Sequence, residues 1–375
     1  MDTPNTKIWL SSPHMGGQEM KYIQEAFAQN WIAPIGPNLD HFESGLGNYL
    51  GVKHVAALSS GTAAIHLALI LLQVKAGDIV LCQSLTFAAS ANPITYLGAT
   101  PAFLDSELDT WNICPEALET AIVHFSKKGI KPKALILVHL YGMPARLSEL
   151  LAICQKYEIP VIEDAAEALG SKYNNTLVGG FGDLGILSFN GNKIITTSGG
   201  GALLSNREEY INNAKFLATQ ARDPAVHYEH SQIGYNYRMS NILAGIGRGQ
   251  LEVIEERVSQ RRSHFEYYKK ALSEIGNIAF QPEPDNCKSN RWLSVFTTLD
   301  SNIDINKIQN ALMNENIETR PIWKPMHLQP VFKDAPYFGG TNAENLFQTG
   351  MCLPSGSNLT DVEKERVTIA LRKQL

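Results

Sequence analysis

The sequence predicts an α/β protein: a mostly parallel β-sheet covered by helices on both faces, followed by a smaller α+β region. Two observations predict this class. From about residue 53 to residue 204, short aliphatic or β-branched runs alternate with helical stretches, and after residue 201 the pattern changes to longer polar helices. The chain has 375 residues and is 44% hydrophobic, so it can bury a substantial core. We expect a large domain at 1–245 and a smaller one at 246–375.

The first region can be followed element by element, because each expected strand precedes an expected helix. The strands are expected at 55–58, 78–82, 101–104, 134–138 and 159–162, and the helices at 62–72, 88–97, 115–124, 147–157 and from about 165. Pro115 and the glutamate after it suit a helix start. In sheets of this kind, ligands bind where loops leave the carboxyl ends of the strands.

The second region is expected to begin with long polar helical sequence at 241–272. A segment with two prolines and few apolar residues, 280–288, indicates a loop or linker. Beyond it, the apolar run 292–299 and helices at 305–315 and 360–373 predict the small α+β domain.

Charge and cysteine content exclude several classes of protein. The formal net charge is −5 and there is no long basic run, which argues against sequence-independent binding of nucleic acid. The N-terminus lacks the basic start and apolar stretch of a secretory signal, so we expect the cytoplasm. The longest apolar stretch, 63–74, is too short to span a bilayer, so no membrane contact is expected. The five scattered cysteines predict reduced thiols, and we expect no metal site.

Lys193 is the first candidate for chemistry. It lies in a polar, glycine-containing island between the apolar run 184–187 and the glycines 199–201. A lysine in such a setting can lose hydration, lower its pKa and form a Schiff base with an aldehyde. Most lysines only solvate a surface, so the inference depends on the neighbouring motifs.

The segment Ser59–Ala64 follows an expected strand and opens an expected helix. Its hydroxyls and free N–H groups, with the helix dipole behind them, favour a phosphate. An ordinary helix N-cap explains the same residues equally well. Ser188, five residues before Lys193, offers a further hydroxyl.

Two more residues would suit a flat, charged ring such as pyridoxal phosphate (PLP). Asp164 ends an apolar strand, where a buried carboxylate needs a cationic partner such as a protonated pyridine nitrogen. Phe87 comes soon after the strand that ends at Cys82 and could stack on the ring. The alternatives are a helix N-cap for Asp164 and core packing for Phe87.

In this order the motifs make the chain similar to a known family. It resembles the DegT/DnrJ/EryC1/StrS nucleotide-sugar aminotransferases, which have the aspartate-aminotransferase-like fold type I of PLP enzymes. The resemblance runs from about residue 8 to the C-terminus. It is carried by the segments 31–37 (Trp-Ile-Ala-Pro-Ile-Gly-Pro), 60–62, 163–168, 188–193 and 234–240 (Gly-Tyr-Asn-Tyr-Arg-Met-Ser).

The resemblance implies a role for each motif residue at the cofactor ring. Lys193 is implied to bind PLP as a Schiff base and to shuttle the proton during transfer. Asp164 is implied to pair with the pyridine nitrogen, and Phe87 to stack on the ring. Glu167 is implied to lie on the side of the ring hydroxyl, where many relatives carry glutamine.

The phosphate is implied to bind Gly61, Thr62 and Ser188, with Asn236 reaching across from a second subunit. A homodimer with shared active sites is therefore expected.

The residues expected to contact the substrate are Trp31, Arg238 and His327. A guanidinium matches phosphate oxygens, so Arg238 is a candidate pyrophosphate clamp, with an exposed salt bridge as the alternative. Trp31 and His327 lie in loops that border the sugar site in the family, and packing at a domain border would explain them equally well.

The activity implied is transfer of an amino group from L-glutamate to a nucleotide-linked 4-keto-6-deoxy sugar, for a bacterial surface glycan or glycoprotein. The string 188–201 is most similar to enzymes of the UDP-bacillosamine pathway, so a UDP-linked sugar is expected. The alternatives are a GDP- or dTDP-linked sugar, amination of a 3-keto position, and a PLP-binding regulatory protein without turnover. The family's dehydratase branch has histidine in place of the lysine, and Lys193 speaks against it.

Overall fold

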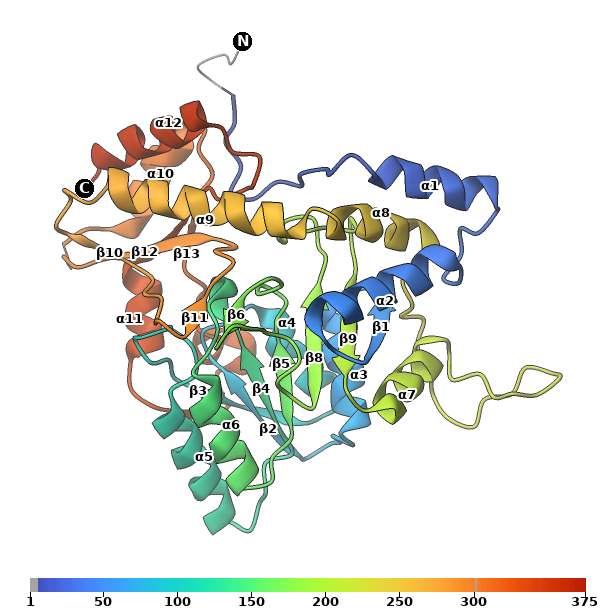
Figure 1. Ribbon diagram of the computed structural model, residues 1–375. Coiled ribbons are helices and arrows are strands. Elements are labelled where there is room, and N and C mark those ends of the chain that lie inside the picture. Colours follow the sequence, from blue (N-terminus) through green and yellow to red (C-terminus); the bar gives the residue numbers. More distant parts are fainter. Residues whose placement is uncertain (1–5, 301) are drawn as a thin grey trace.

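The computed structural model describes residues 6–300 and 302–375, and its centre is an eight-stranded β-sheet (Figure 1). In spatial order the strands are β1 (His54–Leu58), β9 (Gly201–Ser205), β8 (Leu184–Ser188), β5 (Val161–Asp164), β4 (Ala134–Val138), β2 (Ile79–Gln83), β3 (Thr100–Leu104) and β14 (Tyr337–Phe338). Neighbouring strands pair in parallel except at β9, which is antiparallel to β1 and to β8. The prediction of a mostly parallel sheet is confirmed.

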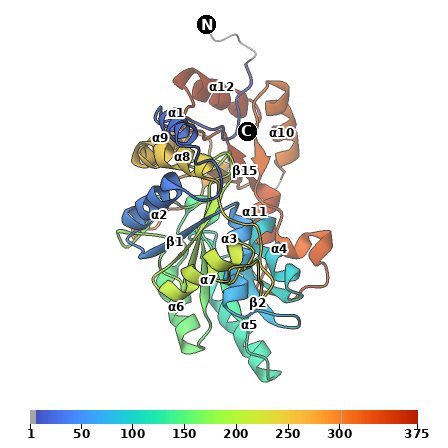
Figure 2. The ribbon, with the colours of Figure 1, turned by 90° about the vertical axis from the view of Figure 1, so that its right-hand side faces the viewer.

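Helices cover both faces of this sheet, because alternate strand residues point to opposite sides. Leu135 and Leu137 of β4 pack in one core with α2 (Pro37–Leu50), α5 (Pro115–Lys127) and α6 (Leu147–Lys156). Ile136 and Val138 pack in the other core with α3 (Gly61–Leu71), α4 (Ala88–Tyr96) and α7 (Glu208–Ala218). Figure 2 shows α2 and α6 on one side of the strands and α3 and α4 on the other.

The rest of the chain builds a second, antiparallel sheet. Its order is β10 (Ile278–Phe280), β12 (Ser294–Thr298), β15 (Gly350–Leu353) and β13 (Arg320–Pro321). Phe296 of this sheet packs in a third core with Tyr268 of α9 (Ile254–Ala271), Leu312 of α10 (Ile305–Asn314) and Leu371 of α12 (Asp361–Arg372). The remaining helices are α1 (Glu19–Ala28), which packs along α8 (Asn241–Leu251), α11 (Asn342–Thr349), and the short 3₁₀ turns η1 (Leu140–Gly142), η2 (Met326–Leu328) and η3 (Pro330–Phe332).

Four details differ from the sequence-based expectation. The helix expected from about residue 165 does not form, because the chain passes from β5 into turns. The helical stretch 241–272 is two helices, α8 and α9, because Val253 leaves the helical conformation with φ −110° and ψ 10°. The expected loop 280–288 ends in β11 (Cys287–Lys288), which pairs with β6 (Lys172–Tyr173) of a three-stranded sheet completed by β7 (Thr176–Leu177). The late strand β14 joins the large sheet beside β3.

The boundary expected near residue 245 stays a prediction, and it falls inside α8. Residues 1–5 of the expected first domain lie outside the described residues. Within residues 6–300 and 302–375, no helix combines the length and the apolar composition that a membrane crossing needs.

Candidate active site

A cavity of about 400 Å³ lies at the carboxyl edge of the large sheet. The strand ends are level there, because Asp164 at the end of β5 pairs with Val138 of β4 and Ile186 of β8. Seven predicted site residues line the cavity: Gly61, Thr62, Phe87, Asp164, Glu167, Ser188 and Lys193. The structure thus brings together every residue that the sequence assigned to the chain's own cofactor site.

Asp164 presents a buried carboxylate to this cavity. It is 4% exposed, and its Oδ2 accepts a hydrogen bond from the Ser90 hydroxyl at 2.7 Å, while Oδ1 accepts one from the Ala166 N–H at 3.2 Å. In the described part of the chain it makes no ion pair. Burial raises the pKa of Asp164, although Ser90, Ala166 and the charge of Lys193 work in the opposite direction. A cationic ligand group in the cavity would therefore stabilise the charged carboxylate.

Lys193 and Glu167 face each other across the same cavity. The Lys193 Nζ lies 3.5 Å from Oε1 of Glu167 and 3.9 Å from the ring centroid of Trp292. Oε2 of Glu167 accepts a hydrogen bond from the Tyr141 N–H at 2.7 Å. Burial raises the pKa of Glu167, and the nearby Lys193 opposes that shift. The amine is thus held between a carboxylate and an aromatic face, with its end open to a ligand.

The beginning of α3 and the end of β8 form what we call the anion seat: Ser60, Gly61, Thr62 and Ser188. Ser60 is the N-cap, and its hydroxyl accepts a hydrogen bond from the Ala63 N–H at 3.0 Å. For Ser60, the alternative of an ordinary helix N-cap is therefore the one that the structure shows. Gly61 and Thr62 are the first residues of the helix, and their N–H groups have no acceptor within it. These groups and the Ser188 hydroxyl remain for an anion.

Glycine is required beside this seat. A Cβ on Gly201 would lie 2.4 Å from the nitrogen of Gly61 and from the carbonyl carbon of Ser60. The close approach of β9 to the start of α3 explains the last glycine of the triplet 199–201.

One side of the cavity is an aromatic wall made of Phe87, Trp292 and Trp323, with Tyr141 behind them. Tyr141 stacks between Trp292 and Trp323, with ring centroids 6.3 and 5.9 Å away. Phe87 is 54% exposed and lies 5.4 Å from Trp323. Sequence reasoning gave neither tryptophan a role, because neither has a local motif.

Tyr141 is held in an unusual backbone conformation, with φ 56° and ψ 21°. Its N–H donates to Glu167, and its hydroxyl accepts from the backbone N–H of Trp323 at 2.9 Å. Left-handed backbone is uncommon for an aromatic residue, so these contacts offset a real conformational cost. Tyr141 therefore links the wall to the carboxylate beside Lys193.

A buried hydrogen-bonded pair supports the strand that carries Asp164. Glu163 and His139 are both fully buried, with His139 Nε2 2.9 Å from Glu163 Oε1. The Ala145 N–H donates to Nδ1 of His139, so Nε2 carries the hydrogen. Although burial raises it, the bonds from His139 and from the Gly179 N–H hold the pKa of Glu163 below its ordinary value. The end of β5 is thus fixed by interactions that do not reach the cavity.

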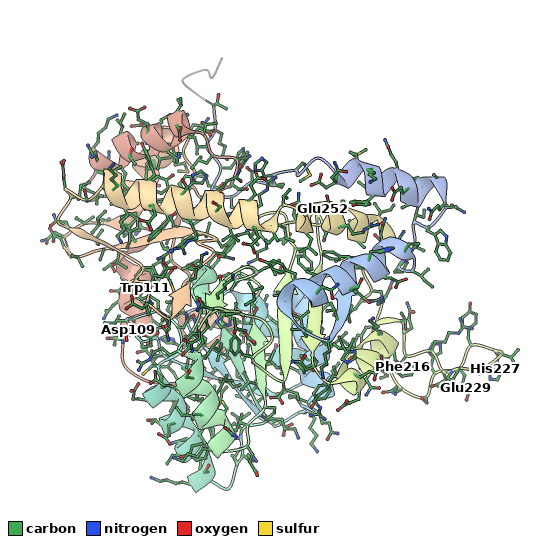
Figure 3. The ribbon with its side chains drawn as sticks, in the orientation of Figure 1. Asp109, Trp111, Phe216, His227, Glu229 and Glu252 are labelled. Atoms are coloured by element: carbon green, nitrogen blue, oxygen red, sulfur yellow. The ribbon has the colours of Figure 1, made fainter. Side chains whose placement is uncertain are left out.

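Two other predicted residues lie outside the cavity lining. Asn236 is exposed and lies near the end of the long loop between α7 and α8. Figure 3 shows this loop projecting from the molecule, with His227 and Glu229 labelled near its tip. Trp31, 44% exposed, lies between α1 and α2, and its carbonyl accepts from the Asn241 side chain at 2.7 Å.

Arg238 and His327 are engaged within the chain. Arg238 donates from Nη1 to Oε1 of Glu43 at 2.6 Å, and its side chain is 9% exposed. The imidazole of His327 contacts the Ser84 hydroxyl at 2.7 Å and Glu344 at 3.2 Å, so its surroundings are those of a packing residue. A pyrophosphate contact by Arg238 stays a prediction that requires its ion pair to open.

The residues present fit PLP group by group. The unpaired carboxylate of Asp164 suits a protonated pyridine nitrogen, and the anion seat suits a phosphate. The Lys193 amine, which lines the same cavity, suits an aldehyde. The pyridine nitrogen, the phosphate and the aldehyde of the cofactor would thus each meet a group of matching chemistry.

Known proteins resemble the chain over nearly its whole length. The model of the DegT/DnrJ/EryC1/StrS aminotransferase family matches residues 13–372. The chain is 56% identical to EpsN of Bacillus subtilis (strain 168), which carries the name of a pyridoxal phosphate-dependent aminotransferase; 96% of this chain and 94% of EpsN are covered. It is 34% identical to the GDP-perosamine synthase of Caulobacter vibrioides, with 98% of each chain covered. The crystal structure of the aminotransferase TlmJ from Streptoalloteichus hindustanus matches with a TM-score of 0.90, at 28% identity and 98% coverage of each chain.

Proposed function

Because the chain belongs to the DegT/DnrJ/EryC1/StrS aminotransferase family, we propose that it transfers an amino group from L-glutamate to a UDP-linked 4-keto-6-deoxy sugar. The product is a UDP-linked 4-amino sugar for a bacterial surface glycan or glycoprotein. The observation that carries the proposal is the convergence of Lys193, Asp164 and the anion seat on one cavity.

The general activity follows from the family itself. The chain is a PLP-dependent sugar aminotransferase with the fold type I architecture. The predictions of family, fold, enzyme class and cofactor are therefore confirmed. A PLP-binding regulator without turnover is set aside.

The chain's residues divide the work as follows. PLP, when bound, supplies an aldehyde that accepts the amino group and a ring that withdraws electrons from the reacting carbon. Without substrate, Lys193 would hold the aldehyde end; with substrate bound, its free amine would take the proton from the α-carbon of the donor and would return a proton to the sugar carbon that receives nitrogen. Asp164 keeps a proton on the ring nitrogen, and its burial strengthens that pairing.

The remaining residues hold and shield the cofactor. Gly61, Thr62 and Ser188 bind the phosphate, and the aromatic wall keeps water from the reacting face. Glu167 accepts a hydrogen bond from the Tyr141 N–H, which leaves its other oxygen for the ring hydroxyl or for Lys193. Phe87 stacks on the ring, which its exposed position at the cavity allows.

Assembly and substrate contacts complete the proposal. Asn236 is exposed near the end of the loop between α7 and α8, where it can contact a second copy of the chain, so we propose a homodimer with shared sites. Trp31, exposed between α1 and α2, is a proposed sugar-nucleotide contact. His327 stays a prediction, as does residence in the cytoplasm.

A GDP-linked acceptor is the second candidate. It is favoured by the 34% identity to a GDP-perosamine synthase over nearly the whole chain. The residues at the cavity edge do not separate these acceptors, because rings and hydroxyls there suit any keto sugar.

A substrate panel tests the proposal. The PLP-loaded protein is first mixed with L-glutamate alone, which should bleach its yellow colour. It is then assayed with UDP-, GDP- and dTDP-linked 4-keto-6-deoxy sugars. We expect kcat/KM to be highest for the UDP sugar by at least about tenfold. A higher value for the GDP sugar selects the second candidate, and no transfer to any of them contradicts the proposal.

A further inference from the structure

We propose that Glu43 and Arg238 are positioning residues that hold the anion seat in the shape that the phosphate of PLP requires. This inference rests on the proposed binding of that phosphate at Ser60, Gly61, Thr62 and Ser188. It goes further by giving a role to Glu43, which carries no motif.

The starting point is the open edge of β1. This strand lies at one end of the large sheet, where β9 is its one partner strand among the described residues and Leu58 forms an isolated bridge with Arg238. The Ala57 N–H on its outer edge is bound by a side chain, and the Ala57 carbonyl is bound by a side chain and by the Met239 N–H at 3.3 Å. The Ala57 N–H donates to Oε1 of Glu43 at 2.8 Å, and the Ala57 carbonyl accepts from Nη1 of Arg238 at 3.0 Å. Without Glu43, the Ala57 N–H at this sheet edge would rely on water for its hydrogen bond.

The two side chains also bind each other in a nearly buried ion cluster. Oε1 of Glu43 accepts from Arg238 at 2.6 Å, and Oε2 accepts from Nζ of Lys215 on α7 at 2.5 Å. The side chains of Glu43 and Arg238 are only 8% and 9% exposed. Charge-assisted hydrogen bonds in such surroundings are strong, and losing Glu43 leaves the charge of Arg238 nearly buried without its carboxylate partner. Glu43 thereby joins α2, β1, α7 and the segment that carries Arg238.

This cluster lies close to the anion seat in space, because it binds Ala57, shortly before the N-cap Ser60. Tyr237, the residue before Arg238, accepts a hydrogen bond from the Ser59 N–H at 2.7 Å. The segment 237–238 is therefore hydrogen-bonded to Ala57 of β1 and to Ser59, which immediately precedes the N-cap Ser60. On the other side, the close packing of Gly201 leaves the seat no room to move toward β9. A shift of Arg238 would displace the first N–H groups of α3 from the phosphate.

The same segment leads directly to Asn236, which we expect to reach the phosphate of a second subunit. Asn236 precedes Tyr237 and forms an isolated bridge with Thr219 after α7. The Glu43–Arg238 pair therefore positions the chain's own anion seat. It also positions Asn236, which we expect to contact the phosphate in a second subunit. This differs from a pyrophosphate clamp, which would leave PLP binding untouched.

The test measures PLP affinity, by titrating the cofactor-free protein and following absorbance. We expect Glu43→Gln and Arg238→Gln each to weaken PLP binding about tenfold. With PLP saturating, Glu43→Gln should change the KM for the sugar nucleotide less than twofold. Ser188→Ala should weaken PLP binding as well, because it removes a group of the seat itself. Arg238→Lys, which keeps the charge, should recover part of the affinity.

A matched control is Glu283→Gln, which breaks a partly buried ion pair with Arg262 (2.7 Å) far from the seat. It should lower the melting temperature without changing PLP affinity. If Glu43→Gln behaves like Glu283→Gln, the pair is only structural and the proposal is overturned. A higher sugar-nucleotide KM for Arg238→Gln with unchanged PLP affinity also overturns it, in favour of a pyrophosphate clamp. If Ser188→Ala leaves PLP binding unchanged too, the error lies in the proposed seat.

Discussion

The two sides of the cavity are built by different means. On one side, Asp164 and Glu167 are 4% and 6% exposed, lie at and just after the end of the central strand β5, and are fixed by hydrogen bonds from backbone N–H groups. On the other side, the aromatic wall consists of rings that contact mainly one another, and Phe87 is 54% exposed. Rigid polar groups can hold charges where they develop, whereas large rings supply apolar contact area. We therefore expect the chemical step to depend on the polar side of the cavity, and recognition of the acceptor sugar to depend on the aromatic wall.

Replacing Lys193 should have the largest effect on the chemical side. Lys193→Ala removes the amine that moves the proton, so turnover should fall by at least about 10³-fold. PLP should still bind noncovalently, because Asp164 and the anion seat remain. Equilibrium dialysis and a transamination assay measure the two quantities. The exposed Lys156, paired with Glu119 at 2.6 Å, provides a control variant, Lys156→Ala, that should keep full activity. Turnover of Lys193→Ala within tenfold of the natural protein would contradict the assignment.

Asp164→Asn should come next, with turnover about 10²-fold lower, because a neutral amide cannot keep the ring nitrogen protonated. The measurement is kcat at saturating PLP and substrates. Asp105 offers a matched control: it follows β3 at the same sheet edge, is 2% exposed, and accepts N–H groups of Gly340 and Ala343 outside the cavity. Asp105→Asn should lower the melting temperature and keep kcat. Equal losses of kcat in both variants would show that Asp164 acts only through the fold.

The wall should give a smaller and different effect. Trp323→Ala removes one ring contact, so the KM for the keto-sugar nucleotide should rise about five- to tenfold while PLP affinity stays the same. The 53% exposed Trp9 is the control, and Trp9→Ala should change neither value. If Trp323→Ala lowers PLP affinity without changing the KM for the keto-sugar nucleotide, the wall does not serve acceptor recognition, and the proposed distinction between the two sides is contradicted.

The smallest effect concerns the pH dependence of stability. Burial raises the pKa of Glu167 above its ordinary value of 4.5, so the folded protein keeps this proton to higher pH than the unfolded chain does. The protonated Glu167 carboxyl makes its full contribution to the free energy of unfolding below pH 4.5. That contribution is lost as the pH rises through the raised pKa. Glu167→Gln cannot titrate, so its free energy of unfolding relative to the natural protein should be about 1 kcal/mol higher at pH 8 than at pH 5.

Urea unfolding of the cofactor-free proteins at both pH values measures this difference. Glu283 is the control of opposite sign. Despite its burial, hydrogen bonding to Arg262 and the charge of Arg291 hold the pKa of Glu283 below its ordinary value. Its stabilisation is present at neutral pH and is lost as the pH falls. A pH-independent difference for Glu167→Gln would mean that the carboxyl is not perturbed.

The polar side of the cavity could be predicted from the sequence, because parallel strands bring their carboxyl ends together. Asp164, Ser188 and Lys193 are each at a strand end or a few residues beyond it, so local patterns and sheet geometry suffice. Their roles came from the family resemblance. The cavity lining agrees with that placement, while the roles themselves await the variants above.

The wall and the supports could not be predicted in this way. Trp292 and Trp323 come from a separate sheet region, and only tertiary packing carries them to Lys193. Arg238 has its partner, Glu43, almost two hundred residues earlier in the chain, so nothing near it indicates a buried ion pair. In the fold, β14 was missed for the same reason, since two residues carry no pattern of their own.

That short strand has a consequence for how the protein is made. β14 (Tyr337–Phe338) pairs with β3 through residues more than two hundred positions earlier, and the Asp105 carboxylate caps the chain just after it. Synthesis proceeds from the N-terminus, so β3 leaves the ribosome long before its outer neighbour exists. Until then it is an unpaired sheet edge of apolar sequence, which is the kind of surface that chaperones cover and that aggregates form on. The last fifth of the chain thus closes the large sheet as well as building its own.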